Sequence, residues 1–222
     1  MKYAKQIPLP LRYRAGNARE DYFVSDCNKE AIRWVDSFPN WPCQMLLVLG
    51  PLASGKTHLA NIFTSNIYQA KDLRYDDVHL MPRVFAVEDI DEVGVSEEVL
   101  FHLYNDAVQQ SKNILFTAKA MPFWHLNDLK TRMNTIPTVH IGLPDDMMMM
   151  SLILKGLSER QLDIQSGVMD YILRCIERSF SAAFRFVELS QSLSLAQQHP
   201  ITIPLAKQVL DAMKQEYLNL NS

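Results

Sequence analysis

Residues 50–57 read Gly-Pro-Leu-Ala-Ser-Gly-Lys-Thr and match the phosphate-binding loop pattern G-x-x-x-x-G-K-[S/T]. A glycine at each end lets the backbone turn tightly, so that its N–H groups point inward around a phosphate. Lys56 then reaches the outer phosphates, and the Thr57 hydroxyl ligates Mg²⁺. The residues expected to contact the nucleotide in this segment are Gly50, Pro51, Ala53, Ser54, Gly55, Lys56, Thr57 and His58.

The flanking residues supply the elements that such a loop needs. Met45 to Leu49 is a short apolar run that ends at Gly50, and residues 56–68 have a helical pattern. Strand, loop and helix therefore come in the required order. A helix that begins at Lys56 adds the positive end of its dipole to the same phosphate. This context favours nucleotide binding over a chance match.

Two acidic residues follow a second apolar run, Val84 to Val87. If this strand lies beside the loop strand, Glu88 holds Mg²⁺ through water and Asp89 polarises the attacking water. The alternative is a strand that ends in an ordinary acidic turn. Thr117 closes another apolar run, 113–117, and a polar side chain there is placed to orient the attacking water.

The rest of the chain divides into an α/β part and a helical part. Apolar runs that alternate with helical patterns predict a parallel sheet with helices on both faces. After Pro144 only helical patterns appear, which predicts a small all-helical subdomain. The expected organisation is an extended tail at 1–20, an α/β nucleotide-binding subdomain at 21–144 and a helical subdomain at 145–222. The expected helices are 28–37, 56–68, 96–109, 145–160, 166–178, 182–198 and 203–218, and the last strand is 139–141.

Composition excludes several other classes. The net charge is −3 and no basic stripe is present, which argues against strong direct DNA binding. The three scattered cysteines lack metal-ligand spacing and indicate reduced thiols. Neither a signal peptide nor a long apolar stretch occurs, so we expect a cytoplasmic protein without a membrane span.

The order of these motifs resembles that of the AAA+ ATPases and, within them, the DnaA family of replication initiators. The resemblance covers nearly the whole chain. A family pattern "GKTHL" continues the loop into His58 and Leu59. The other matching segments are Asp21 to Ser25 with Asn28, Val87 to Ile90, Phe101 to Asn105, Ile114 to Thr117 and Leu129 to Arg132. The chain ends soon after the helical part, where DnaA continues into a DNA-binding domain. This feature favours a regulatory member of the family.

The resemblance implies ligands and partners. Phe23 and Val24 would lie along the adenine of ADP or ATP, and the helical part would form a lid. Arg132, an ordinary surface arginine on residue type alone, would be an arginine finger that acts in trans on ATP held by DnaA. Hydrolysis there would prevent re-initiation, and a nucleotide-dependent homo-oligomer is possible. The tail segment Gln6 to Leu11 would dock on the DNA polymerase sliding clamp, with Gln6, Leu9, Pro10 and Leu11 as the contact residues.

The sequence departs from the family pattern in three places. Glu88 stands where DnaA has aspartate. In the lid, the family position of the second sensor arginine falls near Ser181, and the nearest arginines, Arg178 and Arg185, are several residues away. The interval between Lys56 and Glu88 is short, so we expect an abbreviated second strand within 71–83. These departures predict a nucleotide binder with weak or absent turnover of its own.

Two other kinds of function remain open. A self-sufficient ATPase or small-molecule kinase uses the same loop but needs an acceptor site, which the lid sequence does not reveal. A non-stimulating adaptor, or a helicase-loader-like protein, binds its partner without promoting hydrolysis.

Overall fold

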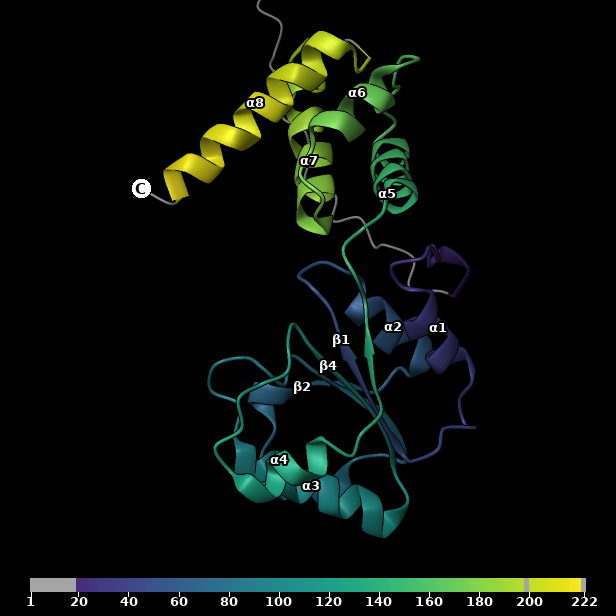
Figure 1. The fold of residues 1–222 in the computed structure, drawn as a ribbon, viewed down its shortest axis with the longest axis vertical. Helices are drawn as coiled ribbons and strands as arrows, with labels where there is room; N and C mark the ends of the chain where they lie inside the picture. Colours follow the sequence, from purple (N-terminus) through teal and green to yellow (C-terminus); the bar gives the residue numbers. More distant parts are fainter. Residues whose placement is uncertain (1–18, 198–199, 221–222) are drawn as a thin grey trace, which may run out of the picture.

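Among the described residues, five parallel strands form one sheet in the order β2-β3-β4-β1-β5, with helices on both faces (Figure 1). The computed structural model describes residues 19–197 and 200–220. The strands are β1 Met45–Leu49, β2 Ile67–Gln69, β3 Val84–Glu88, β4 Asn113–Ala118 and β5 Thr138–His140. The helices of this part are α1 Lys29–Asp36, α2 Lys56–Phe63, α3 Glu97–Gln110 and α4 Asn127–Met133. This is the predicted fold class.

Alternate residues of β1 face two different cores, because successive side chains of a strand point to opposite faces. Leu47 packs in the core under α3 and α4, whereas Leu46 and Val48 pack in the core under α1 and α2. Every residue of β1 is buried, which explains its unbroken apolar sequence.

The predicted helix at 56–68 is too long, because α2 ends at Phe63. The residues after Phe63 lead into β2, the edge strand of the sheet. The Thr64 hydroxyl and the Asn66 side-chain amide both donate to Val84 O, at 3.3 and 3.2 Å. These bonds join the end of α2 to the start of β3 and turn the chain into β2.

The second strand is β2, at Ile67–Gln69, so its predicted place within 71–83 is wrong. Two 3₁₀ segments lie there instead: Ala70–Asp72, which begins one residue before the interval, and Tyr75–Leu80, which packs on α3. Asp106 on α3 holds this segment, since its buried carboxylate lies 2.7 Å from His79 Nδ1. The same carboxylate forms an ion pair at 2.7 Å with the buried Lys112.

In the part of the chain that the structure describes after β5, four helices form the second part of the molecule, which stands above the sheet in Figure 1. They are α5 Asp146–Glu159, α6 Val168–Cys175, α7 Phe180–Gln197 and α8 Ile203–Leu220. Their shared core includes Ile153, Ile172 and Phe186. Met148 and Met149, near the start of α5, are buried. This helical part is fixed to the α/β part by Met148 and Phe180, which both pack in the core beside α1 and α2.

Candidate functional site

The phosphate-binding loop connects β1 to α2 and adopts a geometry that depends on its glycines. Gly55 caps α2 in the left-handed region, with φ 88°, and Ala53 is also left-handed with φ 62°. A Cβ on Gly50 would lie 2.8 Å from Ser54 Oγ and 2.9 Å from Ile141 Cβ. Glycine is therefore required at both ends of the loop, for backbone conformation at one and for space at the other.

Lys56 is buried beneath this loop. Its Nζ donates to Gly50 O at 2.8 Å and to Pro51 O at 2.9 Å. Burial lowers the pKa of the amino group, and nearby carboxylates, first that of Asp89 and then that of Asp91, oppose the shift. The cation is thus held inside the turn, within reach of the outer phosphates that such a loop encloses.

Glu88 meets the loop at the carboxyl end of the sheet. The Thr57 hydroxyl hydrogen-bonds its carboxylate, and Gln69 Nε2 donates to Oε2 at 3.2 Å. Oε1 is buried with no hydrogen-bond partner among the described residues. Burial raises the pKa of this carboxyl. An unpartnered carboxylate oxygen beside a hydroxyl is the oxygen pair that Mg²⁺ favours, so the residues present fit a magnesium ion.

The strand carrying Glu88 is not beside the loop strand, and that expectation is wrong. β4 lies between β1 and β3. Thr57 nevertheless reaches Glu88, because it lies in the first turn of α2, a helix that packs over both β3 and β4.

Thr117 fixes the turn after Glu88. Its hydroxyl accepts from Asp89 N at 3.2 Å, and its carbonyl accepts from Ile90 N at 3.0 Å. Asp89 has φ 55°, unusual for a residue other than glycine. The buried Thr117 therefore orients the acidic turn between the two strands.

Phe23 and Val24 lie on the segment that precedes α1, and both are partly exposed. Asn28 holds this segment, since its Nδ2 donates to Phe23 O at 2.9 Å and its Oδ1 accepts from Ser25 N at 2.9 Å. Val24 lines a cavity of about 480 Å³ that opens between this segment and the start of α5. The cavity is lined by Val24, Ser25, Asp26, Lys29, Asp145, Asp146 and Met147.

Asp145 joins the start of α5 to the same segment. Its carboxylate caps the helix by accepting from Met148 N at 2.7 Å. It also hydrogen-bonds the Ser25 side chain and the backbone N–H groups of Asp26 and Cys27. The segment before α1 and the start of the helical part are therefore joined through one carboxylate.

The two candidate lid arginines lie in different surroundings. Arg178 forms an ion pair with Asp146, which lines the cavity. Arg185 points to α8 instead, where it pairs with Glu216, and it also pairs with Glu188. Of the two, Arg178 is the one beside the cavity, and Ser181 is exposed.

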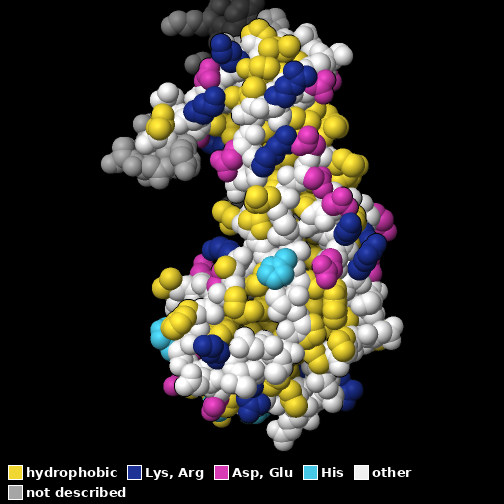
Figure 2. Space-filling view, in the orientation of Figure 1, with side chains coloured by type: hydrophobic (Ala, Val, Ile, Leu, Met, Phe, Trp, Pro, Cys, Tyr) yellow, Lys and Arg dark blue, Asp and Glu magenta, His cyan; other side chains and the backbone are white. Residues whose placement is uncertain are grey.

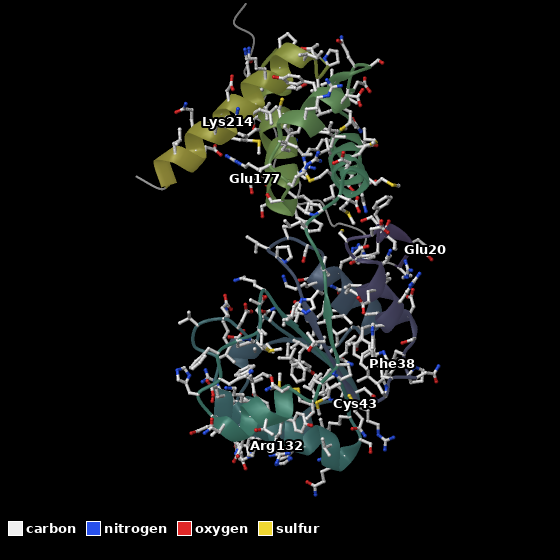
Figure 3. The ribbon with its side chains drawn as sticks, viewed as in Figure 1. Glu20, Phe38, Cys43, Arg132, Glu177 and Lys214 are labelled. Atoms are coloured by element: carbon white, nitrogen blue, oxygen red, sulfur yellow. The ribbon has the colours of Figure 1, made fainter. Side chains whose placement is uncertain are left out.

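Arg132 lies far from this site, at the end of the molecule opposite the lid (Figure 3). Its guanidinium stacks on Phe101 and Tyr104 of α3, at 5.0 and 5.5 Å from the ring centroids. Thr135 secures the end of α4 by donating its hydroxyl to Arg132 O at 2.7 Å. The structure thus separates Arg132 from the other predicted site residues.

The tail residues Gln6, Leu9, Pro10 and Leu11 lie outside the described residues. On the face shown in Figure 2, basic side chains are interspersed with acidic ones. None of the described helices combines the length and apolar composition needed to cross a bilayer.

Sequence reasoning missed three residues of the site. Gln69 and Asp145 act through contacts with Glu88 and with the segment before α1, which no spacing rule reveals. Tyr22 covers the loop, with its ring edge-on to His58 at a centroid distance of 5.1 Å. Tyr22 belongs to the segment that resembles the adenine-contacting one, and its position next to Phe23 was the available signal.

Comparisons with known proteins found similar sequences and similar folds. Residues 145–210 match the family model described as "Hda, lid domain". The chromosomal replication initiator protein DnaA of Buchnera aphidicola subsp. Cinara cedri is 26% identical over 129 residues, which cover 57% of this chain. The chain spans only 30% of the length of that relative.

Among the solved structures with the same fold are two DnaA proteins. Domain III of the Thermotoga maritima replication initiation protein DnaA superposes with a TM-score of 0.72 at 14% identity, over 88% of this chain and 96% of that one. A replication initiator DnaA bound to AMPPCP and single-stranded DNA gives a TM-score of 0.60 at 17% identity, over 81% of this chain and 66% of that one.

Proposed function

Because the chain is a DnaA-family AAA+ protein that resembles Hda, we propose that it regulates the initiation of DNA replication. In this proposal it binds ADP or ATP with Mg²⁺, docks on the DNA polymerase sliding clamp and presents Arg132 to ATP held by DnaA. Hydrolysis of that ATP then prevents re-initiation.

Nucleotide binding is supported by the loop and the acidic strand. The backbone of residues 50–55 and Lys56 would hold the phosphates, and Thr57 with Glu88 would hold Mg²⁺, which supplies charge neutralisation at the phosphates. A DnaA of the same fold binds AMPPCP, an ATP analogue. The cavity beside Val24 offers room for a base next to the lid.

The observation that carries the regulatory proposal is the place of Arg132. It precedes β5 at the amino edge of the sheet, whereas the phosphate-binding loop follows β1 at the carboxyl edge. A strand as long as β1 spans about 16 Å, which is beyond the reach of an arginine side chain. Arg132 therefore does not reach a nucleotide on its own loop. This supports a role for Arg132 on a nucleotide that another molecule holds.

The aromatic stack also suits this role. Phe101 and Tyr104 hold the guanidinium by cation–π contact, worth about 0.5–1 kcal/mol at an exposed site. This contact uses only the faces of the group. The N–H donors that would meet a phosphate lie at its edges.

The test is hydrolysis of DnaA-bound ATP in the presence of clamp loaded on DNA. We expect the wild-type chain to stimulate hydrolysis and Arg132→Ala to lose about 10³-fold of the stimulation, the magnitude typical of an arginine finger. Lys130→Ala, an exposed change on the same helix, is the matched control and should keep it. Equal stimulation by Arg132→Ala and wild type would reject the finger and leave an adaptor that acts by binding alone.

Clamp docking has its own test. A variant with Gln6, Leu9 and Leu11 changed to alanine should lose binding to the clamp, because these side chains supply its polar and apolar contacts. A control with Lys2 and Lys5 changed to alanine should keep it. Binding that survives the first variant would place the clamp-binding surface elsewhere.

A further inference from the structure

Tyr22 is packed directly against the phosphate-binding loop. A Cβ on Gly55 would lie 3.3 Å from Tyr22 Cε2 and 3.8 Å from its hydroxyl oxygen, so the ring rests on the glycine that begins α2. The same ring is edge-on to His58 in the first turn of that helix. Tyr22 is 7% exposed. The ring therefore closes one side of the loop, and its hydroxyl lies beside the helix N-terminus.

The hydroxyl of Tyr22 is buried and has no hydrogen-bond partner among the residues that the structure describes. Burial raises the pKa of this phenol, so it keeps its proton; the nearby Asn28 amide opposes the shift only as a donor, and its Nδ2 already donates to Phe23 O at 2.9 Å. No described group accepts the phenolic proton. A buried hydroxyl left in this state costs about 1–3 kcal/mol, and tyrosine hydroxyls in protein interiors usually have a partner. The unpaired phenolic O–H at this place suggests that a ligand brings the acceptor.

The ligand chemistry follows from the surroundings. The backbone N–H groups at the start of α2 and the Lys56 amino group all favour an anion, so the acceptor expected beside Gly55 is a phosphate oxygen. The loop backbone cradles the inner phosphates, whereas the lysine reaches the outer ones. Tyr22, on the Gly55 and His58 side, is on the inner side of this arrangement.

We propose that Tyr22 is a nucleotide-binding residue whose hydroxyl donates a hydrogen bond to an inner phosphate of the bound nucleotide. The inference rests on the proposed nucleotide site and adds a contact that the loop motif does not contain. It also explains why the aromatic ring is buried over a glycine. The ring positions the hydroxyl and covers the phosphate from water.

The test compares ADP and adenosine binding by the full-length wild-type chain and by Tyr22→Phe, which removes only the hydroxyl. Because a hydrogen bond to a charged group is lost, ADP affinity should fall about tenfold or more. Adenosine, which has no phosphate, should bind both proteins equally. Tyr171→Phe, a half-buried change in the lid, is the matched control and should leave ADP affinity unchanged.

Melting without nucleotide separates this role from a structural one. Removing an unpaired buried hydroxyl should leave the melting temperature of the nucleotide-free variant equal or higher, whereas the rise caused by ADP should shrink. ADP affinity of Tyr22→Phe within twofold of wild type would overturn the inference, and so would a lower melting temperature without nucleotide. A wild-type chain that binds no ADP would instead overturn the nucleotide site itself.

Discussion

Replacing Asp145 by alanine should weaken the connection between the lid and the segment before α1. The carboxylate caps α5 at 2.7 Å from Met148 N, and loss of such a cap costs about 1 kcal/mol. The same carboxylate accepts hydrogen bonds from Ser25, Asp26 and Cys27, and bonds to a charged group are worth about 1.5–3 kcal/mol when buried. Asp145 is only partly buried, so we expect a total loss of roughly 2–4 kcal/mol.

The matched control is the next residue in the chain. Asp146→Ala removes an ion pair with Arg178 in which both side chains are well exposed, and such pairs are worth about 0–1 kcal/mol. Urea unfolding followed by circular dichroism measures both variants. The reasoning fails if Asp145→Ala is no less stable than Asp146→Ala.

The pH dependence gives a second check. Burial raises the pKa of the Asp145 carboxyl, but its hydrogen bonds, first that from Met148 N–H, outweigh this and hold the pKa below its usual value. A carboxyl whose pKa is lowered by folding stabilises the protein above its unfolded pKa of about 3.9 and loses that contribution as pH falls through the folded pKa. The stability gap between wild type and Asp145→Ala should therefore be constant near neutral pH and shrink below about pH 4. A gap unchanged in acid would assign the effect to something other than the carboxylate.

Two further predictions concern the nucleotide site. Gly55→Ala and Gly94→Ala both place a side chain at positive φ, which costs about 1–2 kcal/mol, but only the Gly55 side chain would also press on Tyr22. Urea unfolding should therefore show the larger loss of unfolding free energy for Gly55→Ala. ADP titration should show weaker binding for that variant alone. Glu88→Gln should abolish the Mg²⁺ dependence of ATP affinity. In the wild type, burial raises the pKa of Glu88, so the Mg²⁺ dependence of ATP affinity should fade on acidification at a pH above the usual glutamate pKa of about 4.3. A Glu88→Gln variant whose ATP affinity still depends on Mg²⁺ would exclude Glu88 as a metal ligand.

The sequence predicted the elements whose evidence is local. The apolar runs became β1, β3, β4 and β5, and the helices expected to start at 96 and 145 begin at the N-caps Ser96 and Asp145. Errors occurred where a distant contact decided the structure. Thr64 ends α2 early because β3 offers a carbonyl to it, and β2 is only three residues long because the following segment packs on α3.

In the candidate site too, local patterns were predictable and contacts between distant residues were not. The loop glycines and Lys56 follow a pattern that backbone geometry enforces, so their arrangement was predictable. The contact of Glu88 with Gln69 depends on the register of β2 with β3, and the cover by Tyr22 depends on how the segment before α1 crosses the loop. Neither is encoded in a spacing along the chain.

Because Arg132 and the phosphate-binding loop lie on different ends of the molecule, the molecule has two unlike ends. Any contact that brings Arg132 to the nucleotide of a similarly folded neighbour is heterologous, since it joins unlike surfaces of the two proteins. Such a pair has one occupied junction and still exposes a free loop at one end and a free arginine at the other. Growth by this contact produces an open row of subunits, and a ring forms only if the rotation between neighbours closes. If Arg132 acts in trans as we propose, each copy of this chain would serve only the one nucleotide that faces its arginine, while its own loop would stay open to the next subunit.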